Sequence, residues 1–410
     1  MRGDVPPRRR TTQFGISLVE TMVALVLGLA MVSVAFNLYV SDRSVFRQIE
    51  GMVRLQESAG IATALLETDI RHAAGTLCRN NPPTTTLLNT PSPTKWDDYK
   101  QHVPPIPYAY WQRQDGYGLL GLHGYESINT DPIVGDKRLA GDSISIMSDN
   151  MGKVARVTAP ATHTSASGTG GLTGSYTFPV DNGLNFPAGT VAMACDYTRA
   201  VLFQVTESTA STIKLQANEG PALSPGNCAV TMKKDKGTGP IAAMDDIFSC
   251  YGGQGMNPQY GKMYTFGPGS MIGEHTFHHW YIGRKTNTTD GLSLYRVSMG
   301  YDSKGTPKLD AAKEMVQDVT DMQIEYLPGL LYTGYPFQYF YKVADSTDGT
   351  PSIAAMYKYT YRSVTAVRIV LTLTSPDKVG LTANNAATAV TYTIPINVAI
   401  RSRMPGVVRR

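Results

Sequence analysis

A long apolar run near the N-terminus dominates the hydrophobic pattern of this chain. Residues 16–40, with the sequence ISLVETMVALVLGLAMVSVAFNLYV, contain a single charged side chain, Glu20. At about 1.5 Å of rise per residue, a helix of this length crosses a bilayer core of about 30 Å. Arginines occupy positions 8–10, just before the run, so the positive-inside rule places the N-terminus in the cytoplasm and the remainder outside.

The spacing of apolar residues becomes helical beyond residue 41. Apolar side chains recur every three or four positions, which forms one stripe on a helix and leaves most charged residues elsewhere. They are Val45, Ile49, Met52, Leu55, Ala59, Ala62, Leu66, Ile70 and Ala73. Residues 16–75 contain no proline, and Gly75 is a plausible helix stop. The pattern predicts one helix over residues 16–75, about 90 Å long, whose second half lies along a sheet.

Short strand patterns and turns fill the rest of the chain. Strands are predicted at 143–149, 190–195, 200–206, 211–217, 275–283, 292–298, 319–327, 363–374 and 391–400. SASGTGGLTGS at 165–175 predicts a loop or hairpin tip, and the proline-rich stretch 80–107 an irregular segment. Because no long helix separates these strands, they are expected to pair antiparallel. The expected class is α+β, with one long N-terminal helix packed on an antiparallel β-sheet head that carries large loop insertions.

Composition and charge agree with a folded, exported protein. Hydrophobic residues make up 42% of the chain and charged residues only 17%, with 39 glycines, 25 prolines and 23 tyrosines. The 37 basic and 33 acidic residues give a net charge of +4, but four arginines and one aspartate lie within residues 1–15. The other residues therefore carry 33 basic and 32 acidic side chains, a net charge of +1. A nearly neutral body argues against nucleic acid as a partner.

The cysteines are Cys78, Cys195, Cys228 and Cys250, without CxxC or metal-ligand spacing. An even number beyond a membrane segment indicates disulfides in an oxidising compartment, and free buried cysteines are the alternative. Of the three possible pairings we expect Cys195–Cys228, because these residues flank strand patterns that a hairpin would bring together. Cys78 would then pair with Cys250.

Two ordinary membrane segments are alternatives to a specialised one at residues 16–40. A secretory signal peptide has an apolar core of about 7–15 residues and ends in a small-residue cleavage site, and neither feature is present. A plain single-pass anchor explains the arginines and the apolar run. It does not explain Glu20, because an ionisable side chain in a membrane span is costly.

Residues 14–20, FGISLVE, resemble the type IV prepilin signature. The resemblance implies cleavage by prepilin peptidase between Gly15 and Ile16, N-methylation of Ile16, and retention of the apolar helix for polymerisation. It also implies that Glu20 pairs with the free amine of a neighbouring subunit; in the plainer interpretation Glu20 only reaches the lipid headgroups. Two departures from the family are Ile16 in place of phenylalanine and a long leader.

Patches further along resemble the PilW-type minor pilins. They are LLETDIRHA at 65–73, CD at 195–196 followed by AVLFQVT at 200–206, LYR at 294–296, DVTDMQIEY at 318–326, VTAVRI at 364–369 and VAIRSRMP at 398–405. Against this family, 327–361 and parts of 80–130 are insertions. The resemblance implies three parts: a cytoplasmic leader at 1–15, a helix at 16–75 with its membrane span at 16–40, and a periplasmic or extracellular head at 76–410.

Residue patterns that support chemistry were sought in the head. His275, His278 and His279 lack metal-site spacing; on a strand, His275 and His279 share one face and His278 the other, so we expect a strand surface. GMNPQYGKM at 255–263 has the wrong length and end for a phosphate loop. No cofactor, metal or catalytic residue is expected. The tyrosines and phenylalanines at 332–341 form either a recognition surface or, as we favour, a hairpin that packs its own aromatics.

The sequence and the resemblance together favour a minor pilin, not an enzyme. Such a protein joins other minor pilins and the major pilin in the inner membrane, primes type IV pilus assembly, and sits at the tip in some assemblies. A type II secretion pseudopilin would share the leader and the helix. A membrane-tethered enzyme, or a ligand-binding or adhesive head, is the third hypothesis.

Overall fold

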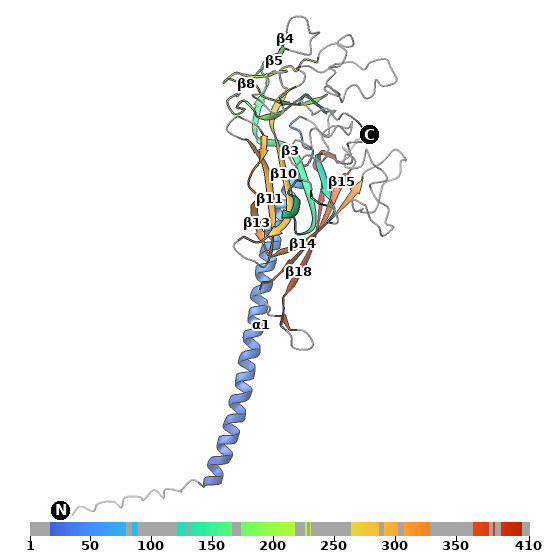
Figure 1. Cartoon of the computed structure of the whole chain (residues 1–410). Helices are drawn as coiled ribbons and strands as arrows, with labels where there is room; N and C mark the ends of the chain where they lie inside the picture. The colour runs from blue at the N-terminus through green and yellow to red at the C-terminus, as the bar shows by residue number, and fades with distance from the viewer. Residues whose placement is uncertain are drawn as a thin grey trace, which may run out of the picture. The chain divides into compact units, whose positions relative to one another are not determined.

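The computed structural model describes residues 17–78, 84–88, 121–127, 130–131, 133–165, 174–217, 226–227, 230, 264–286, 291–301, 307–328, 364–376, 380–381 and 387–403. It contains one long N-terminal helix and antiparallel β-sheets, which confirms the α+β class (Figure 1). Two units can be distinguished. One runs to Arg54 and includes residues 377–390; the other comprises 55–376 and 391–410.

Helix α1, Leu18–His72, is the predicted helix, two to three residues shorter at each end. Its first backbone bonds are donated by the amides of Glu20 and Thr21 to the carbonyl of Ser17. An 18-residue window near its start has a mean hydropathy of 2.2 and is entirely unburied. Among the described residues, α1 is long and apolar enough to cross a membrane.

The predicted apolar stripe is buried from Leu55 onward. Leu55, Ala59, Ala62, Leu66, Ile70 and Ala73 are each at most 2% exposed. Upstream, Val45 and Ile49 are 47% and 57% exposed. The sequence spacing alone does not mark this change, because burial depends on where the β-strands of the second unit begin to cover the helix.

The left-handed residue that follows the helix is Ala74, one residue before the predicted stop at Gly75. Ala74 adopts a left-handed conformation with φ 55°, and the amide of Gly75 donates to the carbonyl of His72. Alanine rarely takes this conformation. Here the Ala74 amide donates to the carbonyl of Met147 at 2.9 Å, and Gly121 lies so close that a Cβ on it would be 2.2 Å from the Ala74 Cβ. Tertiary contacts therefore fix this turn.

The largest sheet has nine strands in the part of the chain that the structure describes. The order along its main path is β1 (Thr84–Thr86), β7 (Ala200–Gln204), β6 (Val191–Cys195), β10 (Met271–Arg284), β11 (Leu292–Tyr301) and β12 (Pro307–Leu309). Strand β3 (Ala140–Arg156) pairs with β10 and with β2 (Leu122–Tyr125), and β13 (Lys313–Gln317) pairs with β11. These pairs are antiparallel except β1–β7, which is parallel.

Two further sheets complete the second unit, and a short one belongs to the first. One contains β14 (Val319–Pro328), β15 (Val364–Thr374) and β18 (Thr391–Ala399) in that order. The other contains β4 (Thr162–Ser165), β5 (Gly174–Pro179), β9 (Thr212–Gln216) and β8 (Glu207–Ser208). Strands β16 (Gly380–Leu381) and β17 (Ala387–Thr388) pair alone. Short 3-10 helices lie at Gly135–Lys137 and Arg401–Arg403.

All nine predicted strands are present, as β3, β6, β7, β9, β10, β11, β14, β15 and β18. The hairpin expected around 165–175 is also present, because Ser165 pairs with Gly174 at the end of β4 and β5. Within the supposed insertion at 80–130, β1 and β2 belong to the main sheet. Most of the insertion expected at 327–361 lies outside the described residues.

The nine-stranded sheet meets the three-stranded sheet of β14, β15 and β18 at Gly141 and Asp142 in β3. Gly141 has φ 62°, and a Cβ on it would lie 2.6 Å from the backbone nitrogen and oxygen of Met322 in β14. The carboxylate of the next residue, Asp142, takes the place of a backbone carbonyl as hydrogen-bond acceptor. Its Oδ2 accepts a hydrogen bond from the Ile324 amide at 2.9 Å, and its Oδ1 accepts one from the Ser127 amide at 2.9 Å. A side chain therefore joins the edge of β14 to the main sheet.

Gly141→Ala is expected to lower the free energy of unfolding by about 1–3 kcal/mol, because a methyl group must displace the β14 backbone and sit at positive φ. Gly60→Ala is the matched control: Gly60 lies inside α1, and a Cβ added to it would meet no atom within 4 Å. That change should stabilise by about 0.5–1 kcal/mol. Denaturant unfolding of the detergent-solubilised chain measures both, and equal effects would contradict the close sheet contact.

Candidate functional site

A partly buried polar contact attaches the second half of α1 to the main sheet. The Trp280 indole Nε1 on β10 donates to Asp69 Oδ2 at 2.8 Å, and Arg296 Nη1 on β11 lies 3.8 Å from the same oxygen. The Arg296 guanidinium also lies 5.5 Å from the centre of the Trp280 ring. Trp280 is fully buried. One carboxylate near the end of the helix thus receives an indole donor and a cation, which fixes the rotation and height of α1 on the sheet.

The segment after the helix, residues 73–78, is called the helix exit below. Its backbone is held from two sides. On β3, the Asp149 amide donates to the Gly75 carbonyl at 3.1 Å, in addition to the Ala74–Met147 bond. Near the C-terminus, Ser402 Oγ donates to the Ala73 carbonyl at 2.7 Å. These bonds satisfy backbone groups that a helix end leaves without partners.

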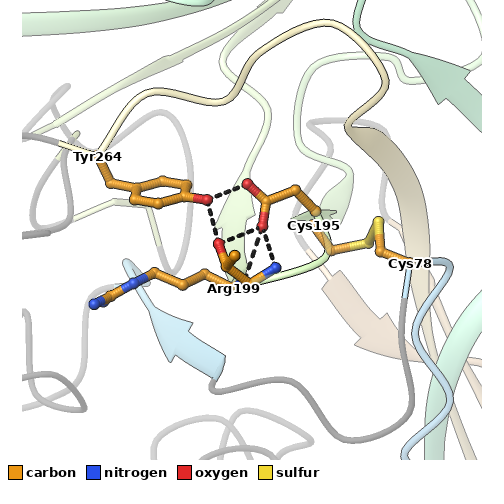
Figure 2. The surroundings of a disulfide bond; sticks show 6 residues. Cys78, Cys195, Arg199 and Tyr264 are labelled. Atoms are coloured by element: carbon orange, nitrogen blue, oxygen red, sulfur yellow. Dashed lines mark hydrogen bonds between the residues drawn. A yellow bond between two sulfur atoms is a disulfide. The ribbon is translucent and has the colours of Figure 1, made fainter.

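A disulfide closes the helix exit onto the sheet (Figure 2). It joins Cys78 to Cys195 at the end of β6, with a Cα–Cα distance of 5.8 Å across 117 residues of sequence. The predicted pairings Cys195–Cys228 and Cys78–Cys250 are therefore wrong. They assumed that strands 200–206 and 211–217 form a hairpin, whereas β7 pairs with β6 and β1, and β9 pairs with β5 and β8. Cys228 and Cys250 lie outside the described residues.

Next to the disulfide, a carboxylate shapes the turn from β6 to β7 (Figure 2). Asp196 Oδ1 accepts hydrogen bonds from the Thr198 amide, the Thr198 hydroxyl and the Arg199 amide at 2.7–2.9 Å. The Tyr264 hydroxyl donates to Asp196 Oδ2, and the Arg199 guanidinium lies 5.6 Å from the Tyr264 ring centre. Although burial opposes it, these donors lower the pKa of Asp196. The cluster positions Cys195 for its bond.

Breaking the Cys78–Cys195 bond is expected to lower the free energy of unfolding by about 4–5 kcal/mol, because the bond closes a long loop in the unfolded chain. The double variant Cys78→Ala/Cys195→Ala, compared with wild type by denaturant unfolding, measures this. Non-reducing peptide mapping should recover one peptide that holds both residues. Recovery of Cys78 with any other cysteine would overturn the pairing.

The three histidines of β10 are buried or half-buried, so the expectation of a strand surface is wrong. His275 Nδ1 lies 3.3 Å from Asp149 Oδ1, and His279 Nε2 lies 3.0 Å from Asp131 Oδ2. His278 is on the opposite face, 2.9 Å from Ser298 Oγ, so the expected alternation is confirmed. Among the described residues, no group of three or more His, Cys, Asp or Glu could hold a metal ion.

His279 belongs to a buried polar network that ties residues 131–138 to the sheet. Its Nδ1 lies 2.8 Å from Ser145 Oγ, and its Nε2 faces Asp131. Asp131 also accepts a hydrogen bond from Ser143 and lies 4.0 Å from Arg138 Nε. Burial alone would raise the pKa of Asp131, but the His279 bond and charge, with Ser143 and a backbone amide, hold it well below its usual value.

Ser145, His279 and Asp131 form a serine–histidine–aspartate chain of hydrogen bonds. In an acyl-transfer enzyme such a chain activates the serine oxygen for attack on a substrate. Here Ser145 and His279 are 0% exposed and Asp131 is 2% exposed, so this oxygen is covered. What the arrangement does in this fold is hold the segment around Asp131 against β3 and β10.

Asp131→Ala is expected to destabilise the protein by about 3–5 kcal/mol, because it leaves Arg138 and His279 buried without their carboxylate. Asp136→Ala is the matched control in the same segment: Asp136 is exposed, and its loss should change stability by less than about 0.5 kcal/mol. Denaturant unfolding measures the change in the free energy of unfolding for both variants. If Asp131→Ala destabilised the protein as little as Asp136→Ala, the network would have no structural role.

Of the remaining residues that the sequence analysis singled out, the structure describes some and not others. Glu20 lies exposed in the first turn of α1. Gly15 and Ile16 precede the described residues, and residues 255–263 and 332–341 also lie outside them. Sequence reasoning missed Asp69, Asp131 and Asp149 as partners of the β10 and β11 side chains. For Asp69 and Asp149 the signal available was a carboxylate beside the predicted apolar stripe or within a predicted strand, where a charge requires a partner. Asp131 lies in no predicted helix or strand, and no such signal marked it.

Comparisons with protein-family models, with curated proteins and with solved structures find no match for this chain.

Proposed function

We propose that this protein is a minor pilin, inserted in the inner membrane by α1 and assembled there with other minor pilins to prime a type IV pilus. In this proposal, prepilin peptidase removes residues 1–15 and the β-rich head lies on the periplasmic side. The major pilin and the other minor pilins are its partners. The PilW-like patches of the head favour a pilus over a secretion system.

The observation that carries the proposal is the difference in burial between the two parts of α1. One uninterrupted helix, Leu18–His72, has an apolar, exposed first part and a second part that is buried from Leu55 onward. A helix that served only as an anchor could end at the membrane surface. A subunit that transmits its position in a filament to its head requires the helix and the head to be joined firmly. The contacts of Asp69 and the disulfide at Cys78 supply such a joint.

Glu20 supports the assembly part of the proposal. It is the single charged residue of the apolar run at 16–40. A carboxylate in an apolar environment costs several kcal/mol unless a cation accompanies it. Cleavage after Gly15 would create such a cation, the free amine of Ile16 in an adjacent subunit. The same cleavage would remove the four arginines of the leader.

The test is to co-express the tagged full chain with prepilin peptidase and with minor and major pilins of a type IV pilus system, extract the membranes in mild detergent and purify the complex. Wild type should begin at Ile16 by intact mass and should retain its partners. Glu20→Ala should lower partner recovery by about tenfold, which corresponds to the loss of one weakly buried ion pair. Glu50→Ala is the matched control, because Glu50 is an exposed carboxylate of the same helix beyond the apolar run.

Two results would contradict the proposal. One is a mature chain that keeps Met1 or is cut after the apolar run. The other is a Glu20→Ala chain that recovers its partners as well as Glu50→Ala does. Because the second half of α1 is fastened to the sheet by contacts of its own, neither variant should alter the thermal unfolding of the head. A change there would mean that folding, not assembly, was measured.

A further inference from the structure

A buried acid–base pair lies directly under the helix exit. Asp149 on β3 and His275 on β10 have side chains that are 0% and 2% exposed, and His275 Nδ1 lies 3.3 Å from Asp149 Oδ1. The same Asp149 holds the exit twice. Its amide donates to the Gly75 carbonyl at 3.1 Å, and its carboxylate accepts the Leu77 amide. Leu77, whose amide the Asp149 carboxylate accepts, directly precedes Cys78 and its disulfide.

Other charged groups near the pair are neutralised by partners of their own. On β10 and β3, Glu274 forms an ion pair with Lys153 at 3.0 Å. On the last turns of α1, Arg71 pairs with Glu67. The packed elements carry further titratable groups. They are His278, His279, Asp69 and Arg296, whose contacts are described above, His72 in the last turn of α1, and the Tyr301 hydroxyl at the end of β11, whose burial raises its pKa.

The space around the pair is apolar and tightly filled. Leu77 packs on Gly273, where a Cβ would lie 2.6 Å from Leu77 Cδ1 and 3.5 Å from the Asp149 Cβ. Met147 and Phe277, the next residues along the same face of β3 and β10, are also buried. Among the described residues, none hydrogen-bonds Asp149 Oδ2. An ionised carboxylate here keeps one oxygen without a donor, which is costly in an apolar site.

Two opposing effects act on the Asp149 proton. Burial raises the pKa of the carboxyl, while the hydrogen bond and charge from His275 and the bond from Leu77 lower it, and burial prevails. A folded-state pKa above the ordinary value of 3.8 means that folding favours the protonated carboxyl. The stabilisation that the Asp149 carboxyl contributes is therefore fully present at pH values below its ordinary pKa. It is lost as the pH rises through the raised pKa of the folded protein.

We propose that Asp149 and His275 form a pH-sensitive lock on the helix exit, closed while the pair shares one dissociable proton and loosened when that proton is lost. With the proton present, the pair carries no net charge and the exit stays docked. Without it, the pair holds a buried negative charge, and the least costly way to hydrate that charge is to lift Leu77 and the exit from β3. The lock controls how firmly α1 is joined to the head, whatever α1 assembles with.

Hydrogen exchange of the full-length chain in nanodiscs tests the lock. The measurement is the protection of a peptide spanning residues 73–78 between pH 5 and pH 8.5, corrected for the intrinsic pH dependence of amide exchange. In wild type, protection should fall by about tenfold for each pH unit above the raised pKa of Asp149. In Asp149→Asn, which keeps an oxygen acceptor for Leu77 but cannot ionise, protection should stay constant.

The matched control is Asp181→Asn, in which the carboxylate that accepts the Arg156 amide on β3 at 2.8 Å is likewise replaced by an amide. It should keep the wild-type pH dependence. If Asp149→Asn does not fold, His275→Gln decides: removing the histidine charge should move the loss of protection to higher pH. Four results would refute the lock. They are protection that does not depend on pH in wild type, protection that depends on pH in Asp149→Asn, loss of the pH dependence in Asp181→Asn, and protection in His275→Gln that is lost at the same pH as in wild type.

Discussion

The attachment of Asp69 to Trp280 and Arg296 is the interaction on which the rest of the head depends. A carboxylate on the buried side of a helix costs several kcal/mol unless it is neutralised and hydrogen-bonded, and these two partners do both. Because they come from β10 and β11, the central strands of the main sheet, the contact fixes one register of α1. The small side chains Ala62 and Ala73 on the same stripe are fully buried. The helix exit, the Cys78 bond and the Ser402 contact all presuppose that register.

Buried polar groups lie at three places where two parts of the head meet. Asp142 joins β14 to the main sheet, Asp131 and His279 hold the segment before β3, and Asp149 and His275 lie under the helix exit. Each carboxylate is close to donors, so each contact tolerates one geometry and penalises others. Apolar packing, as between Phe178 of the four-stranded sheet and Phe203 of β7, also stabilises the head. Because apolar contacts have no preferred direction, they restrict the relative positions of two sheets less than hydrogen bonds do.

Periodicity was sufficient to predict the long helix and nine of the strands, missed short strands such as β1, β2, β12 and β13, and was insufficient to predict how the strands pair. The helix and nine strands follow from local spacing, because apolar periods of 3.6 and 2 are written directly in neighbouring residues. Strand order is not local. Strands 200–206 and 211–217 are adjacent in sequence yet belong to different sheets, and this is why the cysteine pairing was wrong. The histidines show the same limit: alternation along β10 was predicted, but burial of His275 and His279 depends on segments more than 120 residues away.

The Cys78–Cys195 bond also changes the mechanical connectivity of the chain. Without it, tension applied to α1 would have to travel through residues 79–194 before it reached β6. With it, the shortest covalent route passes from the helix exit directly into β6, in the interior of the largest sheet. Residues 79–194 then form a covalent loop off that route, although β3 within the loop still contacts the helix exit through hydrogen bonds. A change in the length of this loop leaves the shortest covalent route from the helix exit to β6 unchanged.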